Sequence, residues 1–183
     1  MGAAAEVVLR DATRADAAAC AAIYAHWVEH STATFEEVAP SAEEMAGRIT
    51  RARERHAWLV AERGGAVIGY AYGGPFKERT AYRFSCEVSV YVDVTARGGG
   101  TGRILYAALL DRMEALGMRM ACGGVTLPND PSVALHRALG FEEVGTYRRI
   151  GWKHGAWRDV TWFQKPLGGD GPPEQTGASG SPA

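Results

Sequence analysis

The chain has 183 residues, of which 46% are hydrophobic and 22% are charged, with 20 Lys and Arg against 21 Asp and Glu. This composition is typical of one globular domain and excludes a disordered acidic or basic chain. The formal net charge of −1 gives no field that would hold the whole protein on a polyanion. We therefore expect neither a nucleic acid nor a membrane as partner.

The cysteines and the N-terminal residues indicate the cellular compartment of the protein. Cys20, Cys86 and Cys122 are odd in number and far apart, with no C-x-x-C spacing, which disfavours a disulfide framework and a zinc finger. No apolar run approaches the roughly 20 residues of a membrane span, and residues 1–10 do not resemble a signal peptide. The sequence predicts a cytoplasmic protein.

The chain divides into one domain and a tail. Residues 168–183 are almost wholly Gly, Pro, Ser, Ala and a few polar residues, which cannot bury enough apolar surface to offset the entropy of ordering. We expect a disordered tail there. Residues 1–167 show neither an internal repeat nor a second composition shift, so they are predicted to form a single domain.

The first half of the chain carries clear helix-start and turn signals. Ser41 and Glu44 form the S-x-x-E pattern of a helix capping box, and Thr13 and Asp16 have similar spacing. Gly64-Gly65 is typical of a two-residue hairpin turn. The predicted order is β-α-α-β-β, over residues 7–10, 13–30, 41–52, 57–62 and 66–72.

The second half begins with a polar and aromatic loop over residues 73–85, too long for a mere connection, and a strand over residues 86–93. Side chains alternate between the two faces of this strand, so Glu87 lies on the face opposite to Cys86. We expect Cys86 to pack in the core rather than act as a nucleophile. The complete order, β-α-α-β-β-β-α-β-α-β-β, implies an α/β (α+β) fold with a mixed sheet and helices on its faces. The later elements are a helix over 104–116, a strand over 118–127, a helix over 131–139 and strands over 141–147 and 157–164.

The most informative segment joins the strand at 86–93 to the next helix. It contains R-x-x-G-x-G, from Arg97 to Gly102, and a second arginine at 103. Glycines let the backbone approach a ligand closely, and a helix N-terminus offers free N–H donors to a pyrophosphate. The Walker and Rossmann patterns both fail here. The alternative is a flexible glycine loop that binds no ligand.

Two motifs together carry a resemblance to a known family. The R-x-x-G-x-G loop is followed by the segment from Asn129 to Phe141, which matches the spacing N-x-x-A-x-x-[LF]-Y-x-x-x-G-F, with Ser132 at the alanine and His136 at the tyrosine. Both resemble the GNAT superfamily of acyl-CoA-dependent N-acyltransferases. The resemblance covers nearly all of residues 6–165. Several further pieces look like its phosphinothricin N-acetyltransferase subgroup, at residues 31–35, 74–79, 81–82, 86–87, 127–132 and 153–159.

The resemblance implies a mixed, mostly antiparallel sheet of about seven strands with helices on both faces. It also implies acetyl-CoA as co-substrate and no metal. The strand at 90–92 and Asn129 would hold the pantetheine arm, and the loop from Gly98 to Arg103 would cradle the pyrophosphate. The residues expected to bind acetyl-CoA are Val90, Tyr91, Val92, Arg97, Gly98, Gly99, Gly100, Thr101, Gly102, Arg103, Asn129 and Ser132.

The same resemblance implies roles in catalysis. Glu87 falls at the general-base position, and His136 replaces the tyrosine that often protonates the departing thiolate. Tyr106 and water are the alternatives for this acid. An amine attacks a thioester only as the neutral base, and a carboxyl with the usual pKa of ~4.3 is a weak base for this. We therefore expect burial to raise the pKa of Glu87, or a water chain to relay the proton.

The resemblance places four residues in the acceptor site: Phe35, Lys77, Arg79 and Tyr82. Two cations suit a small amino acid that bears a second anionic group, because arginine binds carboxylate or phosphinate through paired hydrogen bonds. This favours a glutamate-like acceptor such as phosphinothricin, methionine sulfoximine or methionine sulfone. The alternative is that Lys77 and Arg79 are ordinary solvated charges of a surface loop.

Other functions and partners remain to be weighed against this one. One alternative is a non-catalytic CoA-binding module. Another is a GNAT enzyme that acts on a protein N-terminus or an aminoglycoside. The cationic loop with Lys77 and Arg79 disfavours polycationic aminoglycosides, because like charges repel. The H-x-x-E-H pattern from His26 to His30 leaves a third zinc ligand unidentified, so we expect no metal there. In the resembling subgroup the segment from Trp152 to Trp162 helps form a dimer, which predicts a homodimer.

Overall fold

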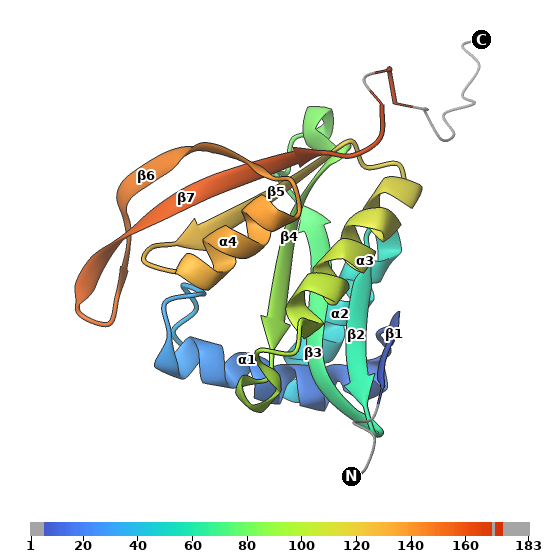
Figure 1. The fold of residues 1–183 in the computed structure, drawn as a ribbon, viewed down its shortest axis with the longest axis vertical. Helices are drawn as coiled ribbons and strands as arrows, with labels where there is room; N and C mark the ends of the chain where they lie inside the picture. Colours follow the sequence, from blue (N-terminus) through green and yellow to red (C-terminus); the bar gives the residue numbers. More distant parts are fainter. Residues whose placement is uncertain (1–5, 170, 174–183) are drawn as a thin grey trace.

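The computed structural model describes residues 6–169 and 171–173 (Figure 1). Its regular elements confirm the predicted mixed α/β fold. In chain order they are β1 (Val7–Asp11), the short 3-10 helix η1 (Arg14–Asp16), α1 (Ala17–His30), α2 (Ala42–Arg55), β2 (Trp58–Arg63), β3 (Ala66–Pro75), η2 (Thr80–Tyr82), β4 (Ser85–Val92), η3 (Val94–Ala96), α3 (Thr101–Ala115), β5 (Met120–Thr126), α4 (Asp130–Ala138), β6 (Glu142–Lys153) and β7 (Ala156–Pro166).

Seven strands form one sheet in the order β1-β2-β3-β4-β5-β7-β6. Every neighbouring pair is antiparallel except β4 and β5, which run parallel. These two pair only from Ser85 to Glu87, against Met120 to Cys122. Beyond Glu87 they separate, so the middle of the sheet opens as a V.

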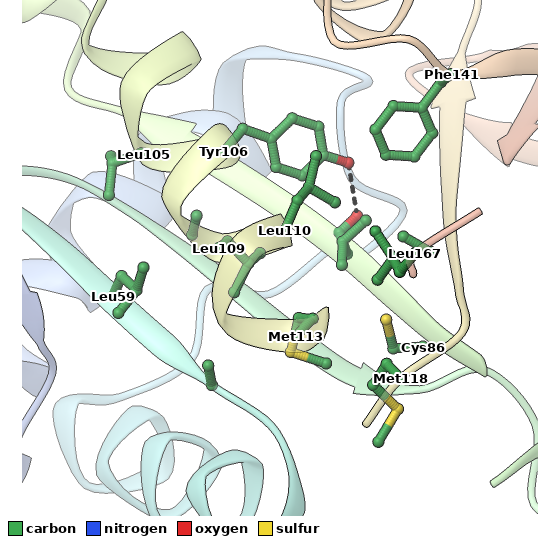
Figure 2. Close-up of a cluster of buried hydrophobic side chains, with 14 of the residues drawn as sticks. Leu59, Cys86, Leu105, Tyr106, Leu109, Leu110, Met113, Met118, Phe141 and Leu167 are labelled. Carbon is green, nitrogen blue, oxygen red and sulfur yellow. Dashed lines mark hydrogen bonds between the residues drawn. The ribbon is translucent and has the colours of Figure 1, made fainter. Parts of the chain in front are cut away.

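Helices cover both faces of the sheet, as expected (Figure 1). One core lies between the sheet and α1 and α2, and it includes Val28 and Ile49. The other lies on the α3 face, where Leu109 and Met113 are fully buried against the strands (Figure 2). The helical spacing of the apolar residues therefore decides which side of each helix packs on the sheet.

The hydrogen bonds expected at the predicted helix starts are present. The Ser41 hydroxyl accepts the backbone N–H of Glu44 at 3.1 Å. The Thr13 N–H donates to the Asp16 carboxylate at 2.7 Å, although these residues cap the short η1 that leads into α1.

The loop predicted over residues 73–85 is shorter than expected, because β3 continues to Pro75, which pairs with Cys86. The last two strands are longer than expected and form a long hairpin that projects from the sheet (Figure 1). Its turn contains Gly155 at φ 69°. The extension past Tyr147 was missed because its partly exposed side chains lack a clean apolar alternation.

Within residues 6–169 and 171–173, the helices are too short or too polar to cross a bilayer. Residues 170 and 174–183 of the predicted tail lie outside the described residues.

Candidate active site

The V between β4 and β5 exposes part of the β4 backbone. The Asp93 N–H donates to the Ile68 carbonyl of β3 at 2.9 Å, so odd-numbered residues of this strand point their backbone groups at β3. The Val92 carbonyl instead accepts from the Trp27 indole at 3.2 Å, and the Val88 carbonyl lies 3.3 Å from the Tyr106 hydroxyl oxygen. Because backbone direction alternates along a strand, the N–H and C=O of Val90 also face the opening.

Small-ligand sites typically measure about 300–1,000 Å³, and the cleft at this opening measures 630 Å³. Its floor is the glycine loop, in which Gly98 and Gly100 have φ angles of 80° and 75°. Such angles favour glycine and aim successive N–H groups in one direction. The buried Thr101 hydroxyl at the start of α3 has no hydrogen-bond partner among the described residues.

The residues predicted to bind acetyl-CoA meet in this cleft. All of them line it except Gly99, which is exposed beside it. Arg97 packs its guanidinium 4.3 Å from the centre of the Trp27 ring. Asn129 caps α4 by accepting the Ser132 N–H at 3.3 Å. The positive N-termini of α3 and α4 thus border one cleft, and the free Thr101 hydroxyl adds a donor suited to a pyrophosphate.

His136 and Tyr106 form a buried pair in the wall of the cleft. His136 Nδ1 lies 2.8 Å from the Ser132 carbonyl, to which it can only donate, so its Nε2 accepts the Tyr106 hydroxyl at 3.0 Å. Burial lowers the pKa of His136, which favours this neutral form. A Cβ at Gly123 would overlap the imidazole, so only glycine permits this close approach.

Glu87 occupies the last β4 position that pairs with β5, at the apex of the V. It shares a strand face with Tyr91, whose ring packs 4.9 Å from that of Tyr24 on α1. Its carboxylate therefore lies on the α1 side of the sheet. Burial raises its pKa above the usual range, and the nearby Lys77 ammonium offsets part of this rise.

A second cavity, of 440 Å³, lies on the same face of the sheet as Glu87. We call it the acceptor-side cavity. Tyr72 and Gly74, which pair with Ser89 and Glu87 of β4, form part of its wall. Its other polar and aromatic lining residues are Tyr24, Arg48, Arg51, Glu54, Arg55, His56, Trp58, Tyr70, Tyr82, Arg83 and Ser85.

The four predicted acceptor residues are not all in one place. Tyr82 lines the acceptor-side cavity, and its ring lies 5.8 Å from Phe76. Lys77 Nζ lies 5.0 Å from the Phe76 ring and 5.9 Å from the Trp162 ring. Arg79 is exposed and lines neither of the two cavities. Phe35 packs over Gly151 of β6, where a Cβ would overlap its ring.

Sequence reasoning missed three aromatic neighbours of this site, Tyr72, Phe76 and Trp162. Phe76 and Trp162 lie 86 positions apart in the chain but have ring centres 5.8 Å apart. The aromatic character of residues 73–85 was the available signal for Phe76. The partner on β7 depends on sheet order, which no local pattern encodes.

The remaining candidates lie away from the chemistry. Cys86 is fully buried on the face opposite to Glu87, and burial raises the pKa of its thiol to about 12, so it packs as expected. His26 and His30 have ring centres 5.0 Å apart on α1. No group of three or more possible metal ligands occurs within the part of the chain that the structure describes.

Comparisons with known proteins identify the family of this chain. The family of acetyltransferase (GNAT) domains matches residues 9–162. A phosphinothricin N-acetyltransferase of Streptomyces viridochromogenes is 43% identical over 91% of this chain and 91% of its own length. An L-methionine sulfoximine/L-methionine sulfone acetyltransferase of Pseudomonas aeruginosa is 38% identical over 87% of this chain and 94% of its own.

Solved structures share the whole fold. A GNAT superfamily phosphinothricin acetyltransferase from Sinorhizobium meliloti, in complex with AcCoA, superposes with a TM-score of 0.90 at 41% identity, covering 94% of this chain and 96% of that one. A structure described as a ribosomal-protein-alanine N-acetyltransferase from Brucella melitensis gives 0.85 at 42% identity, covering 87% and 99%.

Proposed function

Because the chain belongs to the GNAT acetyltransferases, we propose that it transfers acetyl from acetyl-CoA to the α-amino group of a small glutamate-like amino acid. Phosphinothricin, methionine sulfoximine and methionine sulfone are the acceptors that we assign to it. One observation carries the proposal: Glu87 lies at the apex of the V, where its pairing partner Gly74 lines the acceptor-side cavity and the next residue, Val88, lines the cofactor cleft.

The cleft fits acetyl-CoA. The unpartnered Thr101 hydroxyl and the positive-φ glycines suit a pyrophosphate, and the cleft-facing N–H and C=O of Val90 suit the amides of pantetheine. When bound, acetyl-CoA supplies the thioester carbonyl that the amine attacks. The Val90 N–H is the donor that we assign to the charge developing on that carbonyl oxygen.

Glu87 is the general base in this proposal. It takes a proton from the acceptor's α-ammonium, directly or through one water. The raised pKa supports this role, since a carboxyl with a higher pKa accepts a proton from an ammonium more readily than an exposed one. The nearby Lys77 ammonium opposes the effect of burial on this pKa and so favours the ionised carboxylate.

The departing sulfur needs a proton, and the buried pair in the cleft wall is positioned to give it. In the neutral form of His136, the hydrogen shared between the two side chains belongs to the Tyr106 hydroxyl. We therefore assign the acid role to this pair, with Tyr106 delivering the proton and His136 orienting its hydroxyl. Water remains the alternative donor, as in the sequence-based hypothesis.

The cationic surroundings select the acceptor. Lys77 lies beside the Phe76 and Trp162 rings near Glu87, and Arg83 lines the acceptor-side cavity. Cations near a base favour an amino acid with two anionic groups and disfavour polycationic aminoglycosides. Arg79, which is exposed in this single chain, is assigned to the acceptor on the resemblance alone.

The hairpin of β6 and β7 supports the proposed homodimer. It exposes five large apolar side chains, Val144, Tyr147, Ile150, Trp152 and Trp157, each at least half exposed. β6 is also the last strand of the sheet, with a free edge. An apolar face at a free edge suits pairing with a second copy of the chain.

The three free, buried cysteines are consistent with the proposed cytoplasmic location.

The proposal is tested by comparing kcat/KM of the purified protein with acetyl-CoA and five acceptors. These are phosphinothricin, methionine sulfoximine, methionine sulfone, an aminoglycoside and a peptide that begins with alanine. The first three are expected to react best. Preference for the peptide would support the activity named for the Brucella structure instead. Binding of CoA without any acetylated product would indicate a non-catalytic module.

A further inference from the structure

A buried lysine at the end of β6 takes no part in the reaction described above. Lys153 is 3% exposed. Its Nζ donates to the backbone carbonyls of Val28 at 2.8 Å, Thr34 at 2.8 Å and Glu36 at 2.9 Å. A lysine ammonium has three N–H donors, and here each has its own acceptor. All three N–H donors of the ammonium therefore bind backbone carbonyls.

The three carbonyls belong to the end of α1 and to the loop that follows it. Val28 lies in the last turn of α1, where carbonyls lack a partner within the helix and a cation is favourable. Thr34 and Glu36 lie in the connection between α1 and α2. The Lys153 side chain, from the distant β6–β7 hairpin, therefore connects the end of α1 to the loop that follows it.

The same loop residues hold the wall of the acceptor-side cavity. The Tyr24 hydroxyl shares a 2.6 Å hydrogen bond with the Thr34 hydroxyl and donates to the Glu36 carboxylate at 2.9 Å. Arg48 donates to both oxygens of Glu36, at 2.6 and 2.9 Å. Tyr24 and Arg48 line the cavity, so the position of the loop backbone fixes their positions.

Two other contacts join this loop to the hairpin. The His154 imidazole lies 3.1 Å from the Ser31 carbonyl, and the Phe35 ring packs against Gly151. Phe35 lies between the two loop residues whose carbonyls Lys153 binds. The hairpin contacts therefore reach both ends of the segment from Ser31 to Glu36.

We propose that Lys153 is a positioning residue for the amino-acid acceptor, which it serves by holding the Thr34 and Glu36 backbone and, through Tyr24, the cavity wall. This inference rests on the acetyltransferase function proposed above. It assigns part of the acceptor specificity to a side chain that does not touch the acceptor. The glycine loop, which binds the other substrate, makes no contact with Lys153 in the hydrogen bonds of the described residues.

The test uses Lys153→Met, which keeps the length of the side chain and removes all three donors. With phosphinothricin as acceptor, kcat/KM is expected to fall tenfold or more because three hydrogen bonds from a charged donor are lost, while KM for acetyl-CoA changes less than about threefold. Lys165→Met makes the same chemical change on β7, away from both cavities, and is expected to leave both parameters near the wild-type values. If Lys153→Met does not fold, Lys153→Gln replaces it in every comparison.

A double-mutant cycle separates positioning from general stability. Tyr24→Phe removes the hydroxyl that links the loop to the cavity wall. If Lys153 acts through that link, its substitution costs much less in the Tyr24→Phe background than in wild type. Equal losses in the two backgrounds, or parallel changes for both substrates, would overturn the inference. Failure of the wild-type protein to acetylate phosphinothricin would refute the proposed function instead.

Discussion

Replacing Glu87 by glutamine is expected to change activity and stability in opposite directions. Glutamine keeps the shape of the side chain at the apex of the V but cannot accept the ammonium proton. A general base contributes ~10²–10⁴ in rate, so kcat with phosphinothricin is expected to fall at least 100-fold at pH 7, while acetyl-CoA affinity stays nearly unchanged. That loss corresponds to about 2.7 kcal/mol or more of transition-state free energy.

The stability effect follows from the pKa. Burial raises the pKa of Glu87 in the folded state, so folding favours the protonated form, and ionisation at higher pH reduces the free energy of unfolding. Glu87→Gln removes this cost. Its melting temperature is therefore expected to exceed that of wild type at pH 8, with the difference shrinking as the pH falls below the pKa of the folded state.

Two assays check this pair of effects. Steady-state kinetics from pH 5 to 9 should show a wild-type acid limb that levels off above the pKa of Glu87, whereas the rate of Glu87→Gln keeps climbing with pH as more free amine forms. Thermal unfolding at pH 8 and pH 4 gives the stability difference. Wild-type kcat with an unchanged pH profile would refute the assignment of the base, and Tyr82 or a solvent relay would then be the next candidate.

Four further substitutions test the proposed site and the hairpin. Lys77→Met should raise the pKa of Glu87 further and move the acid limb of kcat to higher pH, whereas Lys77→Arg should leave the limb in place. Gly100→Val forces a β-branched residue to φ 75° and should abolish acetyl-CoA binding; unchanged affinity of a folded variant by calorimetry would disprove the role of the loop. Arg79→Ala should raise KM for phosphinothricin much more than KM for acetyl-CoA, and equal changes would indicate a folding defect. Trp157→Glu places a charge on the apolar hairpin and should convert a dimer to a monomer by light scattering; a wild-type monomer would contradict the homodimer.

The sequence was sufficient to predict the geometry of those parts of the candidate site that lie within one short segment. The glycine loop is a strand, a turn and a helix start in succession, and its chemistry is local. The orientation of Glu87 follows from alternation within a single strand, and the structure places it opposite to Cys86 as predicted. Asn129 begins α4 because its side chain caps the helix, which is also a local effect.

Contacts between distant segments could not be predicted in the same way. Lys153 lies beside the hairpin turn and would be expected to point into solvent, as most lysines do. It is buried because three carbonyls from residues more than 100 positions away meet its ammonium. The pairing of Tyr106 with His136 likewise depends on how α3 and α4 pack on the sheet. In each case the partner is set by topology rather than by neighbouring residues.

The register of β4 brings the separate parts of the proposed reaction site together. Glu87 is the last β4 residue paired with β5, and Val88 is the first that faces the open cleft. A thioester held in the cleft and an amine in the acceptor-side cavity can therefore meet where the two strands separate. A shift of one residue would turn Glu87 toward the α3 core and expose Val88 on the acceptor side. Burial of Cys86 and Val88 in that core opposes such a shift, so packing on one face of the strand fixes Glu87, the proposed base, on the other.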